Sequence, residues 1–552
     1  MQKRKNERSA RLKAVLITYI IFVILSTILI PITSNTAKNS TELRITSQLL
    51  ENASSLGQGP QNFSTYIGGS MDDMVYDVDV DDQGNVYICG STKSSDFYVS
   101  ENSYNDTYGG DTDCYVSKIS ADGSEVIWST FIGGPQSDLA NSLKVLADGS
   151  VIVCGESRSV SFPTTEGAYD ESHNGGSDIV VFKISSDGSD LLFSTFIGGS
   201  ADESTSDLDI NSNGIICIAG TTAAADFPTT GGAYNASYGT NVDVCIMELS
   251  ANGQNLLYAT YLGGFDYEDA REVEYTADDK IIVCGSTKSV NFPVTASAYN
   301  DTLYAGTYDV YLTKFNSDAS DLEFSTFIGG SGDDWSYSFE LCESEDILVH
   351  GKTYSTDFPL STGAYDDELT GLTDAFLFKI SKDGSTMMTS TFYGGDGGES
   401  GGSVSIDSDG RIYISGITGS TDLNITDDAM QKNIKGTYDM FITEFLPDLS
   451  DITYGTYIGS SGTDSAYWSC IDCLGYFNLV GYSNDIDFPT TDGAFNTTHN
   501  GGRDVVVIKF PRYPITSDPF PFLIVILVIA AAFAITVLLM IVKKRKKKKS
   551  KS

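Results

Sequence analysis

The stretch Phe63-Ser-Thr-Tyr-Ile-Gly-Gly69 decides the fold, because six variants of it follow along the chain. They are STFIGG at 129–134, FSTFIGG at 193–199, YATYLGG at 258–264, FSTFIGG at 324–330, STFYGG at 390–395 and YGTYIGS at 454–460. The aromatic residues before the apolar-Gly pair are 65, 65, 65, 66, 65 and 65 residues apart. A period this regular predicts a repeat architecture in which each unit packs against its neighbours.

The second unit shows what one repeat contains. Strand-like segments cover 142–146, 151–154, 179–184 and 191–197, with Asp-Gly turn signals between the first two and between the last two. A loop of about twenty residues separates the second strand from the third. Four antiparallel strands with two short hairpins and one long loop predict a propeller blade, and seven units predict an all-β, seven-bladed β-propeller.

Two residues that recur at fixed positions of every unit support this division into blades. A glycine closes the second strand of each unit, at Gly90, Gly155, Gly220, Gly285, Gly351, Gly416 and Gly481. An aspartate opens each third strand, at Asp113, Asp178, Asp243, Asp309, Asp374, Asp439 and Asp504. Because this aspartate does not vary, we expect it to make a structural hydrogen bond that opens the strand.

Together with the FSTFIGG stretch and the DFPTTxGAY-like loop, these residues resemble the seven-bladed β-propeller repeat (SBBP) family over about residues 61–510. The sixth unit departs from the pattern, since Asp422-Leu-Asn-Ile425 replaces the Phe-Pro pair. The resemblance implies a propeller of the kind found on prokaryotic cell surfaces, and it implies no particular reaction.

The position of the first strand predicts how the ring closes. The chain enters with a lone FSTY strand at Phe63 and ends the seventh unit after its third strand at 505–510. We therefore expect the N-terminal strand to complete the last blade. The long loops and the connections between blades then share one face, the two hairpins of each blade lie on the other, and the long-loop face is expected to meet the ligand.

Both ends of the chain carry membrane signals. A basic start precedes the apolar segment 14–30, so residues 1–37 are predicted to be a signal peptide or an uncleaved signal-anchor. At the other end, the apolar segment 522–542 is followed by a basic tail at 543–552, which predicts a transmembrane helix with a cytoplasmic C-terminus. Polar residues 38–60 and the Pro-containing residues 511–521 are expected to link these segments to the propeller at 61–510, outside the cell.

The charge of the chain limits its partners. The formal net charge is −40, and without the basic segments 1–13 and 543–552 it is −53. A field of this sign repels nucleic acid and favours cations or basic partners, and it also suits a solvated extracellular surface. Membrane and an extracellular protein or polysaccharide are the expected partners.

The nine cysteines do not form a disulfide framework in this prediction. Cys89, Cys154 and Cys284 occupy one position in three different repeats, where they are too far apart to pair, so buried free thiols are expected. The Cys470-Ile-Asp-Cys473 pair lacks a second pair of ligands for zinc.

Several N-x-[ST] sequons lie between the two apolar segments. Four of them share one position in the long loop of the repeat, and a fifth lies in the sixth unit. The candidate glycosylation sites are Asn105, Asn235, Asn300, Asn424 and Asn496.

The strongest candidate for chemistry is an acidic residue that follows each Gly-Gly at the start of the innermost strand. These residues, called the junction acids here, are Asp73, Asp138, Glu203, Glu268, Asp334, Glu399 and Asp464. Seven carboxylates around the mouth of the channel predict a site for Ca²⁺ or another hard cation. Two alternatives stay open at this point, namely solvated acids and acids that cap the turns between blades.

No catalytic constellation emerges from the motifs. Gly398-Glu-Ser-Gly-Gly402 matches G-x-S-x-G, but Ser400 is expected at a repeat junction without the strand-to-helix turn that a nucleophile elbow needs. Aromatic residues of the long loop, such as Phe162 and Tyr169, either stack on sugars or pin the loop to its own blade.

We therefore expect a membrane-anchored, non-enzymatic propeller that acts as an extracellular binding or adhesion module. A structural component of the cell envelope without a discrete ligand is the first alternative. A propeller enzyme that acts on extracellular glycans through a pair of the junction acids is the second.

Overall fold

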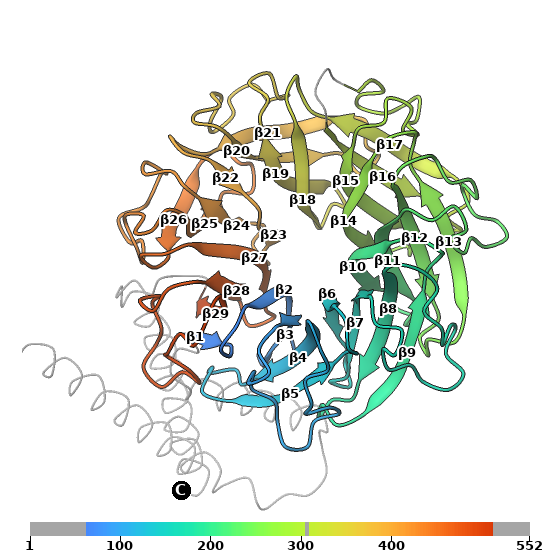
Figure 1. The fold of residues 1–552 in the computed structure, drawn as a ribbon. Helices are drawn as coiled ribbons and strands as arrows, with labels where there is room; N and C mark the ends of the chain where they lie inside the picture. Colours follow the sequence, from blue (N-terminus) through green and yellow to red (C-terminus); the bar gives the residue numbers. More distant parts are fainter. Residues whose placement is uncertain (1–61, 304–307, 512–552) are drawn as a thin grey trace, which may run out of the picture. The chain divides into compact units, whose positions relative to one another are not determined.

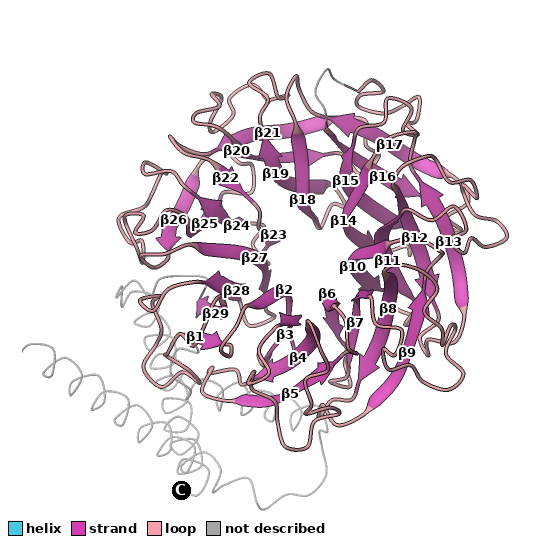
Figure 2. Cartoon of the chain, in the orientation of Figure 1, coloured by secondary structure: helices cyan, strands magenta, loops and turns pink. Residues whose placement is uncertain are grey.

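The computed structural model of this protein describes residues 62–303 and 308–511, and within them every regular element is a β-strand. Seven antiparallel sheets, the blades, are arranged around a central axis (Figures 1 and 2). The chain of each blade runs from the innermost strand outward, so each following blade begins again at the centre. This confirms the predicted seven-bladed propeller.

The first three blades contain twelve strands. They are β2 (Asp73–Val80), β3 (Val86–Thr92), β4 (Asp113–Ile119) and β5 (Val126–Ile132); β6 (Asp138–Val145), β7 (Val151–Ser157), β8 (Asp178–Ile184) and β9 (Leu191–Ile197); β10 (Glu203–Ile210), β11 (Ile216–Thr222), β12 (Asp243–Leu249) and β13 (Leu256–Leu262).

Blades 4 to 6 follow the same plan. Their strands are β14 (Glu268–Tyr275), β15 (Ile281–Thr287), β16 (Asp309–Phe315) and β17 (Leu322–Ile328); β18 (Asp334–Leu341), β19 (Ile347–Thr353), β20 (Asp374–Ile380) and β21 (Met387–Tyr393); β22 (Glu399–Ser400), β23 (Val404–Ile406), β24 (Ile412–Thr418), β25 (Asp439–Phe445) and β26 (Ile452–Ile458). In blade 6 the innermost strand is split into β22 and β23 by Gly401 and Gly402, which both have positive φ angles.

Blade 7 is built from both ends of the propeller. It contains β27 (Asp464–Ile471), β28 (Tyr476–Ser483), β29 (Asp504–Pro511) and, outermost, β1 (Phe63–Ile67). Strand β1 pairs with β29 from Phe63 opposite Lys509 to Ile67 opposite Val505. The predicted closure by the N-terminal strand is therefore confirmed.

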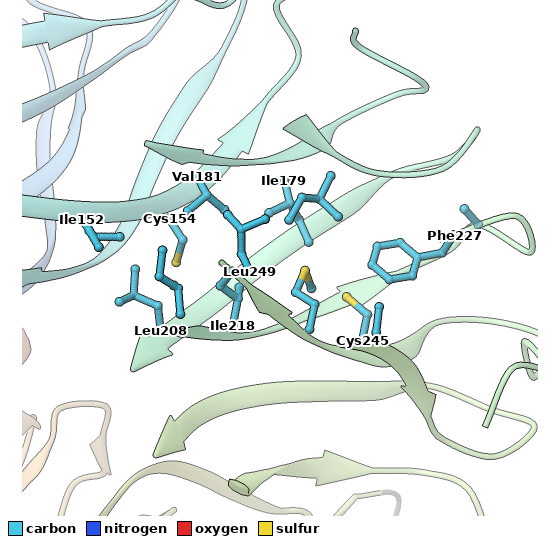
Figure 3. Close-up of a cluster of buried hydrophobic side chains, with 14 of the residues drawn as sticks. Ile152, Cys154, Ile179, Val181, Leu208, Ile218, Phe227, Cys245 and Leu249 are labelled. Carbon is cyan, nitrogen blue, oxygen red and sulfur yellow. The ribbon is translucent and has the colours of Figure 1, made fainter. Parts of the chain in front are cut away.

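The hydrophobic core lies between neighbouring blades, because each twisted sheet presents apolar side chains on both faces. Figure 3 shows the cluster between blades 2 and 3, where Cys154, Val181 and Ile218 pack with Leu208 and Phe227. All nine cysteines are free thiols, and six of them are buried. The prediction of buried thiols in place of disulfides is thus confirmed.

The long loops fold back over the outer edge of their own blades. In blade 1, Ser100 N–H donates to the Ser129 carbonyl at 3.0 Å, and Phe131 N–H donates to the Asn105 carbonyl at 3.0 Å. Each loop thereby covers the edge of the outermost strand, which would otherwise expose unpaired backbone groups.

The middle of the loop also reaches the next blade. Tyr104 N–H donates to the Gly188 carbonyl at 2.8 Å, Tyr169 N–H to the Gly253 carbonyl at 3.0 Å, and Phe495 N–H to the Gly123 carbonyl at 2.8 Å. Phe162 is buried and Tyr169 packs against the core, so these aromatic residues pin the loop to the propeller. This leaves the ends of the loop, and not its middle, at the face where the innermost strands begin.

The predicted apolar segments 14–30 and 522–542 lie outside the described residues. Within 62–303 and 308–511 there is no helix of the length and hydropathy that a membrane span requires.

Closure of the ring through β1 can be tested with one substitution. The N–H groups of Ser64 and Tyr66 point to the loop of blade 7, so the N–H of Thr65 faces β29. Thr65→Pro removes this donor from the ladder and should destabilise the protein by roughly 1–3 kcal/mol. Thermal unfolding measures the effect, and Asn62→Pro, just outside the ladder, is the control. Equal stability of the two variants would contradict closure by β1.

Candidate functional site

Each junction acid is buried at the point where the chain enters a new blade. Asp138 shows the pattern: its Oδ2 accepts the Gly134 N–H at 2.7 Å and the Ser159 hydroxyl at 2.9 Å, while Oδ1 accepts the Ser157 hydroxyl. The carboxyl therefore ties the Gly-Gly turn from the preceding blade to the second strand of its own blade. This is why the acid always follows the Gly-Gly pair by the same number of residues.

The other copies repeat these contacts. The N–H of the second turn residue donates to the acid at 2.7 Å in the pair Gly69–Asp73, at 2.9 Å in Gly199–Glu203, at 3.1 Å in Gly264–Glu268, at 2.7 Å in Gly330–Asp334, at 3.2 Å in Gly395–Glu399 and at 2.6 Å in Ser460–Asp464. The longer glutamates fill the same role as the aspartates. This explains why both acids occur at one position.

The aspartate that opens each third strand lies on the other side of the same turn. A Cβ atom added to Gly133 would lie 2.9 Å from Asp138 Oδ2 and 3.0 Å from Asp113 Oδ1. Asp113 also accepts the Gly109 N–H of the long loop at 2.5 Å, a contact of the kind expected of an aspartate that opens a strand. The first glycine of the FSTFIGG stretch is thus wedged between two buried carboxyls.

Each junction therefore holds a pair of carboxyls, contributed by the third strand of one blade and the first strand of the next. The pairs are Asp504–Asp73, Asp113–Asp138, Asp178–Glu203, Asp243–Glu268, Asp309–Asp334, Asp374–Glu399 and Asp439–Asp464. Within the described part of the chain, the Oδ1 atoms of Asp113, Asp178 and Asp374 have no hydrogen-bond partner.

Burial and this pairing favour the protonated form of the carboxyls. Burial, with a contribution from the neighbouring Asp138, raises the pKa of Asp113 to about 6. Burial likewise raises the pKa of Glu203 and of Asp374 to about 7, with contributions from Asp178 and Glu399 respectively. A pair of neighbouring carboxyls then holds fewer than two negative charges at neutral pH.

Of the three interpretations of the junction acids, capping of the turns between blades fits this geometry. The acids are buried among backbone and hydroxyl donors and are not solvated. Among the described residues, no group of three or more His, Cys, Asp or Glu is placed to hold a metal ion. Ca²⁺ binding by Asp73 and its equivalents stays a prediction.

The raised pKa values predict that stability increases on mild acidification. A carboxyl whose pKa is higher in the folded than in the unfolded state stabilises the folded state at low pH. This contribution is complete below the unfolded pKa of about 4, and it is lost as the pH rises through the folded pKa of about 6–7. The melting temperature should therefore rise by roughly 5 °C or more between pH 8 and pH 5. Differential scanning calorimetry across this interval measures the effect.

Asp374→Asn is the matched variant for this experiment, because the amide mimics a permanently protonated carboxyl. It should raise the melting temperature at pH 8 and change little at pH 5. Asp226→Asn is the control, since Asp226 is exposed and hydrogen bonds from Ser200 lower its pKa. A melting temperature that falls from pH 8 to pH 5, or an unchanged profile in Asp374→Asn, would contradict the account of the carboxyl pairs.

Directly after the junction acid, the innermost strand carries a β-bulge that turns one side chain toward the axis. The register shifts between Val75 and Asp77 in β2, and the same irregularity is found in β6, β10, β14, β18 and β27. Bulges of this kind re-aim side chains next to binding sites. The bulge residues are Tyr76, Asn141, Ser206, Arg271, Tyr337 and Tyr467, and blade 6 has Gly401–Gly402 at this place.

All these residues line one cavity of about 570 Å³, to which every blade contributes. We call it the central cup. Its volume lies in the range of small-molecule sites. It opens where the innermost strands begin, on the face that carries the ends of the long loops. The junction acids are the same in kind in every blade. The bulge residue is tyrosine in blades 1, 5 and 7 but asparagine, serine and arginine in blades 2, 3 and 4, so the cup is asymmetric.

One wall of the central cup, from blades 7 and 1, is aromatic. Tyr76 and Tyr467 form an edge-to-face pair with ring centroids 5.7 Å apart, and Trp468 also lines the cavity. Tyr482 lies 6.0 Å from Tyr467, and the guanidinium of Arg503 lies 4.8 Å from the Tyr482 ring.

The opposite wall, from blades 4 to 6, is cationic and rich in hydroxyls. Arg271 is held by Asp269 through Nη2 at 2.9 Å, and it lies 5.7 Å from the centroid of the Tyr337 ring. The Tyr337 hydroxyl is 2.9 Å from Ser400 Oγ, which accepts from Lys352 Nζ at 3.4 Å.

Deeper in the channel, carboxyls cross from blade to blade. Asp77 Oδ2 accepts the Leu143 N–H at 2.8 Å, and Asp207 Oδ2 accepts the Val273 N–H at 3.0 Å. Lys144 is the cation that faces them: burial lowers its pKa, but Asp207 and the other nearby carboxylates raise it well above the usual value. This acidic belt forms the floor below the central cup.

The remaining candidates have structural surroundings. Ser400 lies on the short strand β22 and not on a strand-to-helix turn, as predicted. His350 is buried between the carbonyls of Phe376 and Gly401, at 3.2 and 3.3 Å, and burial lowers its pKa to about 4.

The candidate glycosylation residues lie in the long loops. Asn105 and Asn300 each accept an N–H from the sequon threonine, at 3.0 and 3.1 Å, and Asn235 and Asn496 make the same contact with the third sequon residue at 2.9 Å. Asn424, in the irregular sixth unit, instead donates to the Tyr365 hydroxyl. Glycosylation at these five positions stays a prediction.

The sequence did not predict the bulge residues of the central cup as a binding site. The repeat draws attention to positions that do not vary, whereas the bulge residue is one of several positions of the innermost strand that vary between blades. Variation between the units therefore does not single out Tyr76, Arg271 and Tyr467. The bulge itself has no signature in the sequence.

Comparison with known proteins supports the fold. The family model described as β-propeller repeat matches residues 62–98, which contain β1 and the first strands of blade 1. No curated protein matches the chain. The described residues thus form a seven-bladed β-propeller, and its first segment matches the β-propeller repeat.

Solved structures similar to this chain include a lyase, an endosialidase and BamB. A catalytically inactive variant of virginiamycin B lyase from Staphylococcus aureus, solved with quinupristin, has 10% identity and a TM-score of 0.39, with 81% of this chain and 99% of that chain covered. BamB from Moraxella catarrhalis has 11% identity and a TM-score of 0.33, with coverages of 80% and 84%. The endosialidase of phage phi92 has 10% identity and a TM-score of 0.39, with coverages of 83% and 70%.

Proposed function

We propose that this protein is a non-catalytic binding module, anchored at the cell surface, that receives its ligand in the central cup. The observation that carries the proposal is the asymmetry of the cup: one structural position is filled by tyrosine, asparagine, serine, arginine and glycine in a ring of nearly equal blades. Blades with the same backbone structure but chemically different residues at the bulge can hold one ligand in one orientation. They do not suit seven equivalent contacts.

The surroundings of the cup favour this role over a purely structural one. The middle parts of the long loops are bound to outer strands and to neighbouring blades, so the hollowed part of this face is its centre. The apolar segments 14–30 and 522–542, with their basic flanks, favour an anchored protein whose propeller lies outside the cell.

The proposal is tested by binding of the purified full chain to arrays of saccharides and extracellular proteins. Tyr76→Leu combined with Tyr467→Leu removes two aromatic residues of the cup and should weaken each interaction about tenfold or more. Tyr98→Leu is the matched control, because Tyr98 is an exposed tyrosine of a long loop. Binding that survives the double change but is lost in Tyr98→Leu would place recognition on the loops and contradict the proposal.

A further inference from the structure

The charge of the central cup differs from that of the molecule around it. The chain carries a formal net charge of −40, yet two cations lie at the wall from blades 4 to 6. Arg271 lines the cup, and Lys352, which is not itself a lining residue, donates to Ser400 Oγ, which is. Both lie near the same ring, since Arg271 is 5.7 Å and Lys352 Nζ 5.9 Å from the centroid of Tyr337. A positive wall in an acidic protein points to a ligand with a negative group.

The two cations are not equivalent. Arg271 is already paired with Asp269, which fixes its guanidinium against the wall. Among the described residues no carboxylate lies within 4 Å of Lys352 Nζ, which donates a hydrogen bond to Ser400 Oγ at 3.4 Å. Lys352 is therefore the cation with donors left for a ligand, and its ammonium has three N–H groups.

The groups beside Lys352 suit a single carboxylate. Ser400 Oγ lies 2.9 Å from the Tyr337 hydroxyl, so one of these two hydroxyls donates to the other and the second proton is left for an acceptor in the cup. One ammonium and one hydroxyl donor match the two oxygens of a carboxylate. A ligand with many negative groups is disfavoured, because the acidic belt with Asp77 and Asp207 forms the floor below.

The rest of the lining suits a sugar ring. The aromatic wall offers the faces of Tyr467, Tyr76 and Trp468 to C–H groups. Between the two walls the cavity is lined by the small polar side chains of Asn141, Ser204, Thr205, Ser206 and Thr221. The carboxyl of Glu156 also lines this part, and burial raises its pKa, which favours the uncharged form. A sugar ring binds through aromatic side chains that stack on its C–H groups and through hydroxyls or amides that form hydrogen bonds with its hydroxyls.

We propose that the central cup binds a saccharide whose ring carries a carboxylate, as in uronic and sialic acids. The carboxylate lies at Lys352, Ser400 and Tyr337, and the sugar ring lies against Tyr467 and its aromatic neighbours. This assignment rests on the proposed binding function and names the chemistry of its ligand.

Isothermal titration of the purified full chain tests the assignment with four probes. They are an oligomer of a hexuronic acid, its carboxyl-reduced neutral counterpart, a sialyl oligosaccharide, and a sulfated neutral oligosaccharide of the same length. We expect at least one carboxylated probe to bind about tenfold or more tightly than the neutral and sulfated probes, since a hydrogen bond to a charged group is involved. The preferred carboxylated probe shows which source of the carboxylate is used.

Lys352→Met should remove the preference for the carboxylate while the affinity for the neutral probe is kept. Tyr467→Leu should weaken all saccharides alike. Lys93→Met is the matched control, because Lys93 is an exposed lysine just beyond the second strand of blade 1, whereas Lys352, Tyr337 and Ser400 belong to blades 5 and 6.

The outcomes separate the two proposals. Equal binding of neutral and carboxylated probes, unchanged in Lys352→Met but weakened in Tyr467→Leu, overturns the carboxylate and leaves the cup as the binding site. Equal affinities for the sulfated and the carboxylated probes also overturn the carboxylate assignment and indicate a site for anions in general. Absence of saccharide binding overturns the assignment, and the array experiment with the double tyrosine variant then decides whether the cup binds another class of ligand.

Discussion

The rest of the structure depends on a buried carboxyl that accepts the backbone N–H of a Gly-Gly turn. Asp138 accepts from Gly134 and from hydroxyls of β7, and thereby joins the end of one blade to the beginning of the next. A second carboxyl, Asp113, lies on the other side of Gly133, and only a residue without a side chain fits between them. Because the same junction is built seven times, the angle between blades is repeated until the ring closes at β1 and β29.

This junction also sets where recognition takes place. The junction acid fixes the start of the innermost strand, and the bulge three residues later turns one side chain toward the axis. The strand pairing on either side of that position is the same, so Tyr76, Ser206 and Arg271 can replace one another without changing the path of the chain. The repeat therefore provides a rigid ring whose central positions are free to specify one asymmetric ligand.

The fold could be predicted from the sequence because the junction leaves a sequence signature. Gly-Gly, the acid and the aspartate of the third strand recur at fixed spacing, and the lone strand at Phe63 predicted the closure. The site could not be predicted in the same way. The same periodicity favours Asp73 and its equivalents as ligands, but these acids are buried and cap the turns between blades. The sequence also favours the long loops as the binding surface, but hydrogen bonds such as that from Ser100 to Ser129 hold the loops to the outer strands. Which residue a bulge turns inward depends on pairing across the strand, and this is decided by three-dimensional packing.

The central claim is that junction residues hold the ring while bulge residues are free for binding. The most direct measurement is the free energy of unfolding of two variants. Gly394→Ala places a methyl group 2.4 Å from Asp374 and 2.7 Å from Glu399 at one junction. The triple change Tyr76→Ser, Tyr337→Ser and Tyr467→Ser gives three blades the residue that blade 3 has at Ser206. The account predicts that the single junction change costs more stability than the three cup changes together. A triple variant that is the less stable of the two would show that the cup residues, and not the junctions, hold the ring.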